Sequence, residues 1–368
     1  MIDWAWAADH LDELAGRVVQ HFVLAGISVG VGFAISLALS VLASRRAAVR
    51  TPLVSLSGIL YTIPSLALFA ALVPVTGLSI LTAVIPLVLY TLLVIVPIFQ
   101  AIRYSGYKWN GLSSPTNFVG LDNFKRAFQD DVFTGALKHN GIIVALSLAV
   151  QLPFALGIAW ILNQRLKGRA LLRVLFFAPF VLSEVVAAVV WSLMLQPNGL
   201  ADHTLDAAGL HSVIHDWLAD PSIVLYSVFI VISWKYFSFH MVLYLAGLQQ
   251  IPKELEEAAA IDGANTRQIF RYVTLPLLGP TIRISVFLSI IGAIQLFDLV
   301  WVMTGGGPVD ASNTMAVYMI NHGFKRFEFG YASAVAVIML MISLLIAITY
   351  QRFVLRRDIQ GALTTMGR

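Results

Sequence analysis

The sequence predicts an all-α membrane protein, a polytopic helical bundle of about eight transmembrane helices, and three observations support this. Of the 368 residues, 58% are apolar and only 12% are charged, against roughly 45–50% and about 25% in soluble domains. Apolar stretches long enough to cross a hydrocarbon core of about 30 Å recur along the chain. Lys and Arg gather at the ends of those stretches, where lipid headgroups lie. A soluble fold of this composition would expose large apolar patches, whereas a bilayer accepts them.

Each predicted span has about the 20 residues that a crossing helix needs. Residues 1–16 contain acidic side chains but no Lys or Arg, so they lack the basic start of a cleaved signal peptide. We therefore expect the first apolar stretch to stay in the membrane. A helix-like stretch at 122–133 lies in the polar connection 104–139. The predicted spans cover residues 20–44, 52–75, 80–102, 141–163, 173–196, 223–248, 275–302 and 333–354.

Composition also excludes several function classes. The chain has no cysteine, which rules out disulfides, thiol catalysis and cysteine metal sites. Its eight histidines show no metal-ligand spacing, so we expect no metal and no other cofactor. A net charge of +4 is too small to indicate nucleic-acid binding. The sequence has no Gly-x-x-x-x-Gly-Lys-Ser/Thr phosphate loop for ATP and no nucleophile and base at a spacing that suggests an enzyme.

The basic residues predict the orientation, because Lys and Arg favour the cytoplasmic side of short loops. They place the connections after the fourth and eighth spans inside, so that 104–139, 197–221 and 304–332 lie outside and 249–274 lies inside. The residues that decide this are Arg165, Lys167, Arg169, Arg173, Arg352, Arg356 and Arg357.

The front of the chain leaves two topologies open. With eight spans and the N-terminus inside, the basic residues between the first two spans would lie outside, against the rule. With seven spans, 52–75 is re-entrant and the N-terminus lies outside. We prefer eight, because an apolar run of that length most often spans. The basic residues in conflict are Arg45, Arg46 and Arg50.

The segment 249–280 carries the most informative pattern, QQIPKELEEAAAIDGANTRQIFRYVTLPLLGP, and predicts two short helices. Pro252 suits the first helical position, where no N–H is needed. Gly263 supplies the stop. Asn265, with Gln268 three residues later, predicts a relative of the capping box at the start of the second helix.

This segment resembles the EAA loop of permeases in binding-protein-dependent ABC importers. The resemblance implies a type I ABC importer permease fold in the bacterial inner membrane. It also implies a loop, 249–276, that docks into a cytosolic ABC ATPase dimer, and it implies a second permease subunit and an extracytoplasmic solute-binding protein as partners. Its small residues leave room for a partner's groove to approach the backbone. The expected coupling residues are Glu257, Ala258, Ala259, Asp262, Gly263, Leu275 and Pro276.

Over about residues 84–360 the chain resembles carbohydrate-uptake permeases of the maltose/oligosaccharide type. The resemblance implies a sugar or oligosaccharide as substrate and does not identify which one. Its motifs are WNGL at 109–112, FVGLDNF at 118–124, IPKELEEAAAIDGA at 251–264 and TGGGP at 304–308.

Residues 20–95 depart from that pattern and look like the first spans of osmoprotectant (quaternary-amine) ABC permeases, notably in YTIPSLALF at 61–69. The chain would then be a fusion, and a betaine-type permease is the alternative function. The expected domain division is an N-terminal membrane segment at 1–103, an extracytoplasmic loop at 104–139, a permease core at 140–356 and a cytoplasmic tail at 357–368.

Ionisable residues inside spans are costly and face a cavity or a partner helix. Five are predicted there: Glu184, Lys235, His240, Arg283 and Asp298. Sugars bind to mixtures of aromatic faces and hydrogen-bonding groups, and two clusters offer such a mixture. The candidate substrate-pathway residues are Trp234, Lys235, Tyr236, Gln295, Phe297 and Asp298.

Other readings of these residues stay open. Lys235 could instead pair with Asp298 or Glu184 between helices, and Arg283 could reach a lipid headgroup. In an ion-coupled secondary transporter, Asp298 or Glu184 would be the coupling carboxylate, although we detect no inverted repeat of the kind that such carriers show.

Overall fold

The computed structural model describes residues 95–355 except residue 165. The chain divides into two compact units, Met1–Gln100 and Ala101–Arg368, and almost all of the described residues belong to the second. Among these residues the secondary structure is helical apart from an isolated antiparallel bridge between Tyr107 and Phe118. The predicted spans 20–44 and 52–75, and most of 80–102, lie outside the described residues. The first described helix is α6 (Val96–Ser105).

The first long helix begins earlier than the sequence predicts. It joins α8 (Asp131–Leu146), a π-helical turn (Ser147–Gln151) and α9 (Leu152–Asn163) into a 33-residue run. Asp130 separates it from α7 (Asp122–Gln129) and caps it, since its carboxylate accepts hydrogen bonds from the N–H groups of Val132 and Phe133 at 2.9 and 3.2 Å. This cap satisfies two of the orphan donors at the helix start. The predicted span 141–163 is therefore confirmed as the distal part of a longer helix.

The prediction of one continuous span over 173–196 is wrong. The chain forms α10 (Arg169–Val181) and α11 (Glu184–Met194), bent by 96° at residues 182 and 183. Ser183 caps α11 by accepting from the N–H of Val186 at 3.2 Å. Lys235, from another helix, donates to the carbonyl of Leu182 at 2.5 Å. The break is stable because the helix ends that it creates find these partners.

The predicted span 275–302 is likewise interrupted. Its helical run begins at α15 (Thr266–Ile269), passes through a π turn (Phe270–Thr274) and α16 (Leu275–Leu277), and bends by 67° before α17 (Gly279–Ile294). Pro280 has no N–H to continue the ladder at the bend. A separate short helix, α18 (Asp298–Met303), follows.

The remaining spans are confirmed as α13 (Val224–Gln249) and α20 (Phe329–Tyr350). In the most apolar 18-residue stretch of α13, 61% is buried inside the structure, against 22% in the corresponding stretch of the run that begins with α20. Accordingly α13 lies at the centre, packed against α9 and α10. By length and composition three described helices can cross a membrane, or five if each bent pair counts as one span.

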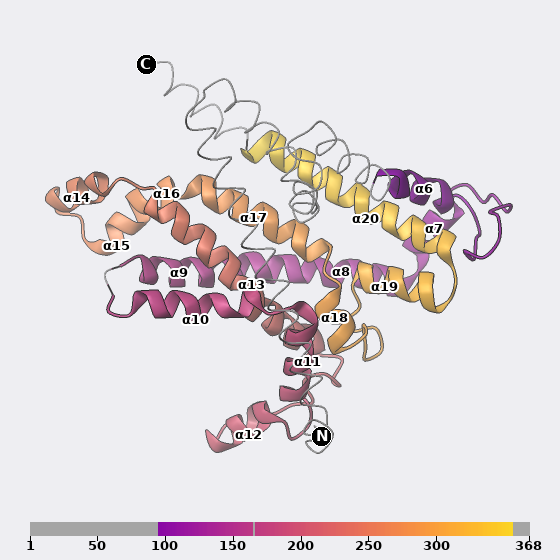
Figure 1. The fold of residues 1–368 in the computed structure, drawn as a ribbon, viewed down its shortest axis with the longest axis horizontal. Helices are drawn as coiled ribbons and strands as arrows, with labels where there is room; N and C mark the ends of the chain where they lie inside the picture. The colour runs from indigo at the N-terminus through magenta and orange to yellow at the C-terminus, as the bar shows by residue number, and fades with distance from the viewer. Residues whose placement is uncertain (1–94, 165, 356–368) are drawn as a thin grey trace, which may run out of the picture. The chain divides into compact units, whose positions relative to one another are not determined.

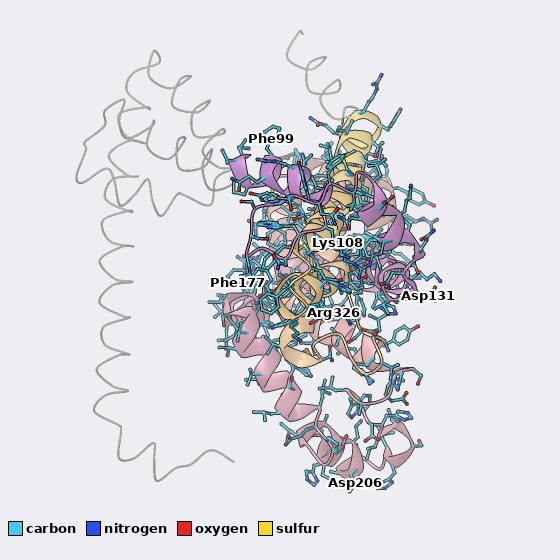
Figure 2. The ribbon with its side chains drawn as sticks, turned by 90° about the vertical axis from the view of Figure 1, so that its right-hand side faces the viewer. Phe99, Lys108, Asp131, Phe177, Asp206 and Arg326 are labelled. Atoms are coloured by element: carbon cyan, nitrogen blue, oxygen red, sulfur yellow. The ribbon has the colours of Figure 1, made fainter. Side chains whose placement is uncertain are left out.

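The two ends of the second unit carry different structures (Figure 1). At one end, called the loop end, lie α14 (Lys253–Ile261) and α15. At the opposite end, called the cap end, lie α7 and α19 (Met315–Ile320). A third feature, α12 (Leu200–Ala207), projects with the segment 197–221, and Figure 2 labels Asp206 at its tip, well away from Lys108.

Buried polar side chains hold the cap end together. Asn140 donates to the carbonyl of Ala293 at 2.6 Å and accepts from the N–H of Met315 at 2.9 Å. Thr314 donates to the carbonyl of Leu296 at 3.0 Å. We call the group His139, Asn140, Asn313 and Thr314 the polar seam; it ties α8 to the end of α17 and the start of α19.

The segment that carries the WNGL and FVGLDNF motifs is anchored mainly by its main chain. Asn123 donates to the carbonyls of Ser105 and Tyr107 at 2.8 and 3.0 Å. Gly330 donates to the carbonyl of Trp109 at 3.0 Å, and a Cβ atom at Gly330 would lie 1.9 Å from the Tyr107 oxygen. The segment can therefore lie against α20 only because residue 330 has no side chain.

Candidate functional site

The loop end presents the predicted coupling residues on an exposed helical hairpin. α14 carries Glu257, Ala258 and Ala259, and Asp262 follows its last residue as the C-cap. Pro252 lies just before the helix instead of at its first position, with φ −59° and ψ 128°. Glu257, Ala258, Asp262 and Gly263 are exposed, and Ala259 is half-buried. The small side chains therefore leave this backbone open to a partner.

The turn of this hairpin is as the sequence predicts. Gly263 has φ +86°, and a Cβ atom added there would meet nothing within 4 Å. A left-handed residue of this kind ends helices, and glycine adopts it without steric cost. The Asn265 and Gln268 side chains each accept from the other residue's N–H, at 3.0 and 2.8 Å, which confirms the predicted capping box.

A side-chain hydrogen bond attaches the hairpin to the helical run that leads into α17. Thr274 donates to the Glu256 carboxylate at 2.8 Å, which fixes α14 to the π turn before α16. Between the hairpin and the connection from α9 to α10 lies a cavity of about 1220 Å³, and Glu257 is part of its wall. Leu275 and Pro276, the other predicted coupling residues, lie on α16, where Pro276 is exposed.

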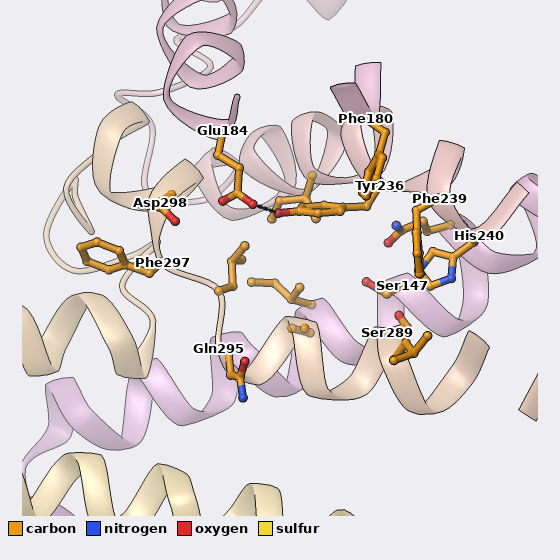
Figure 3. A pocket seen from close by; sticks show the side chains of 17 residues that line it. Ser147, Phe180, Glu184, Tyr236, Phe239, His240, Ser289, Gln295, Phe297 and Asp298 are labelled. Atoms are coloured by element: carbon orange, nitrogen blue, oxygen red, sulfur yellow. Dashed lines mark hydrogen bonds between the residues drawn. The ribbon is translucent and has the colours of Figure 1, made fainter. Parts of the chain in front are cut away.

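A second cavity of about 400 Å³ lies between the membrane helices (Figure 3). It collects four of the predicted pathway residues from two helices and the connection between α17 and α18: Tyr236, Gln295, Phe297 and Asp298. The Phe297 ring stacks on Trp301 at 5.4 Å between centroids. In Figure 3 Asp298 and Phe297 lie at one end of the cavity, and His240 and Ser289 at the other.

The other two predicted residues point elsewhere. Trp234 does not line the cavity and packs edge-on against Trp191 at 5.4 Å. Lys235 is 3% exposed and donates to the carbonyls of Leu182 and Phe180 at 2.5 and 3.5 Å. The alternative prediction that Lys235 pairs with Asp298 or Glu184 is therefore replaced by a helix-end contact. Its ammonium lies at the negative end of α10, where a cation is favourable.

Glu184 lies on the other side of the same break and also lines the cavity. Its carboxylate accepts a short hydrogen bond from the hydroxyl of Tyr236. Because Glu184 occupies the first turn of α11, its charge lies at the positive end of that helix. Neighbouring residues of α13 thus contact both sides of the break between α10 and α11; we call this arrangement of Glu184, Lys235 and Tyr236 the clamp.

Sequence reasoning missed the neutral side of the cavity. Ser147, Gln151 and Ser289 line it, and Ser147 and Gln151 are only 3% exposed. They lie on spans that otherwise look uniformly apolar, and a hydroxyl or amide within such a run is the signal that could have found them. His240 also lines the cavity, with its Nδ1 atom 2.7 Å from the Ser285 hydroxyl. Arg283, the remaining predicted ionisable residue, accepts from the Tyr350 hydroxyl through its carbonyl at 2.8 Å.

An exposed small-residue hairpin at one end of membrane helices, beside a cavity lined by aromatic and some polar side chains, is typical of importer permeases, and the family comparison agrees. Residues 151–358, more than half of the chain, match the model of the binding-protein-dependent transport system inner membrane component. The chain belongs to this family. The permease is accordingly an inner-membrane protein of an ABC importer, and it acts as a transport component.

Relatives align with most of the permease. It is 32% identical over 271 residues to the trehalose/maltose transport system permease protein MalF of Thermococcus litoralis, covering 72% of this chain and 91% of that one. It is 32% identical over 273 residues to the diacetylchitobiose uptake system permease protein NgcF of Streptomyces coelicolor, covering 71% and 77%.

The fold also matches a solved structure. A chain of a bacterial alginate ABC transporter, crystallised with its alginate pentasaccharide-bound periplasmic protein, superposes with a TM-score of 0.64 at 21% identity, covering 74% of the permease and 92% of that chain. The predicted type I importer fold is thus confirmed. The predicted resemblance of residues 20–95 to osmoprotectant permeases gains no support from these comparisons.

Proposed function

We propose that the permease translocates a sugar or oligosaccharide, which a solute-binding protein delivers and a separate ABC ATPase dimer drives. Relatives that are about one third identical over most of the chain are named for the uptake of trehalose and maltose or of diacetylchitobiose. The cavity between the membrane helices has the mixed surface that a sugar needs, with the Phe297 and Tyr236 rings beside hydroxyl and amide groups.

The exposed hairpin at the loop end is the observation that carries the coupling role. Residues 257–263 combine alanines, a left-handed glycine and two carboxylates, Glu257 and Asp262, on a turn whose hydrogen bonds are local. A partner's cleft can therefore contact this backbone without disturbing the membrane helices. We assign the ATPase contact to Glu257, Ala258, Ala259, Asp262 and Gly263, with Leu275 and Pro276 linking the hairpin to α17.

A second permease subunit completes the pathway in this proposal. Asp298 and Gln295 are exposed in the single chain although they lie beside membrane helices. Polar groups at such positions face a partner or a water-filled path. In the same proposal the loop end lies in the cytoplasm and residues 104–139 lie outside the cell, which the opposite positions of the loop end and the cap end support.

The coupling role is tested with Gly263→Asp and Glu257→Lys in the complete importer, reconstituted in liposomes with its ATPase, second permease and solute-binding protein. We expect ATP-dependent uptake to fall at least about tenfold, because a side chain at φ +86° strains the turn and both changes alter the docking surface. The membrane-inserted amount should stay constant.

The matched variant is Asp298→Ala, which leaves the hairpin unchanged and alters the cavity. We expect it to lower uptake while the ATPase still co-purifies, whereas the two hairpin variants should lose the ATPase. Full uptake and full ATPase retention in Gly263→Asp and Glu257→Lys would remove the coupling role. If the intact importer takes up no sugar, the proposed substrate class is wrong.

A further inference from the structure

The wall of the cavity between the membrane helices is acidic. Among the described side chains that line it, two are carboxylates, Glu184 and Asp298, and none is Lys or Arg. The remaining polar groups are neutral hydroxyls and amides, apart from the His240 imidazole. A solute that enters this space therefore meets hydrogen-bonding groups and negative charge, and the described part of the wall offers no cation to receive an anionic group.

Lys235 is one cation adjoining this wall, and its ammonium is already engaged. The side chain is 3% exposed, and it donates to the carbonyls of Leu182 and Phe180. It could turn toward the cavity only by abandoning carbonyls at a helix end, which is unfavourable away from water. Its charge offsets part of that of Glu184, and Asp298 is a second carboxylate on the same wall.

The positions of the two carboxylates add to this effect. The Tyr236 hydroxyl fixes Glu184 from one side. Asp298 lies next to Phe297 and is exposed in the single chain. A ring that packs on Phe297 or Tyr236 thus brings its substituents close to a carboxylate. Because helices replace part of the solvent around these carboxylates, their repulsion of another anion is stronger than it would be in bulk water.

We infer that this cavity selects neutral or amino-substituted saccharides and disfavours saccharides that carry carboxylates, with Glu184 and Asp298 as the charge-selecting residues. The inference rests on the proposed saccharide pathway and adds the charge of its substrate. A protonated amine is attracted by both carboxylates, and a neutral hydroxyl can donate a hydrogen bond to either of them. A uronate is repelled and finds, on the described part of the wall, no cationic donor that would compensate for the repulsion.

The test uses three probes: the 4-nitrophenyl glucoside, the glucosaminide, in which an amine replaces the C2 hydroxyl, and the glucuronide, in which a carboxylate replaces the C6 hydroxymethyl group. Their binding is measured on the purified complex of the permease with its ATPase and second permease, with the solute-binding protein left out so that its own selectivity does not enter. We expect the glucuronide to bind about tenfold or more weakly than the other two. The double variant Glu184→Gln, Asp298→Asn should reduce that difference to about threefold or less.

Asp216→Asn is the matched control, because it removes one carboxylate from an exposed position on the segment 197–221, outside the cavity wall. It should leave the discrimination unchanged. A glucuronide that binds as tightly as the glucoside, or a discrimination that survives in the double variant, would overturn the charge inference while leaving a saccharide pathway in place. Binding of none of the three probes would overturn the saccharide pathway together with the inference.

Discussion

The exposed hairpin at the loop end and the polar seam both depend on an asparagine side chain, yet the two asparagines bond to residues at very different distances along the chain. Asn265 is exposed, and its hydrogen bonds join it to Gln268, three residues away. Asn140 is 2% exposed, and its hydrogen bonds reach Ala293 and Met315, far along the chain. A locally closed hairpin can change its surface without unfolding the protein, whereas the seam holds three helices at once. The residues proposed to meet partners are thus separate from those that maintain the fold.

Of the substitutions that test this comparison, Asn140→Ala should have the largest effect on the stability of the complex. It leaves the Met315 N–H and the Ala293 carbonyl buried without their partner, at roughly 1–3 kcal/mol each. We expect the complex to lose several degrees in Tm and to yield less folded protein, with uptake falling in step with that yield. Thermal melting of the purified complex measures this. Unchanged melting would mean that the seam is not a structural tie.

Asn265→Ala makes the same chemical change on the exposed hairpin and should have a much smaller effect. Losing a helix cap costs about 1 kcal/mol, and here the loss is confined to the start of α15. Amide hydrogen exchange should rise in residues 266–269, while the Tm of the complex stays within about 1 °C. A melting change as large as that of Asn140→Ala would show that the hairpin is not locally closed.

The smallest expected effect concerns pH at the cap end. Burial lowers the pKa of His322 below its ordinary value of 6.5, and the Arg326 and Arg126 charges lower it further, against the opposing effect of Glu328. The contacts indicate the neutral tautomer, since Arg326 lies 3.3 Å from Nε2 and the Nδ1–H can donate to Glu328 at 2.7 Å.

Because the unfolded chain takes up a proton at this histidine more readily than the folded one, its contribution to stability is present above pH 6.5 and declines as the pH falls below that value. The Tm should therefore be lower at pH 5.5 than at pH 7.5. His322→Gln should show a smaller difference between the two. An equal difference in both proteins would assign the pH dependence to other groups.

Residues 141–163, 223–248 and 333–354 could be predicted as helices because each apolar run is long and its ends are polar. The hairpin could also be predicted, because glycine and the Asn265 and Gln268 pair act within a few residues. The break in 173–196 could not, since no glycine or proline stands at Leu182 or Ser183, and the partner that stabilises it, Lys235, comes from a distant helix.

The same limit applies to the cavity. The sequence predicts Trp234, Lys235 and Tyr236 as pathway residues, and of these three Tyr236 does reach the cavity. The sequence cannot show which of these neighbouring side chains faces the cavity. Trp234 turns away because it packs against the Trp191 ring, and Lys235 turns away because it contacts the end of the broken helix. Only the packing of α10 and α11 around α13 decides this.

The unbroken length of α13 has a mechanical consequence. Near its middle the helix holds the clamp, and its last residue, Gln249, is followed within a few residues by the first residue of α14, Lys253. A helix is stiff along its axis, and at 1.5 Å per residue the distance from Lys235 to Gln249 is about 20 Å. A displacement that reaches Gln249 would therefore be carried to the clamp along one rigid helix, with no break in α13 to absorb it.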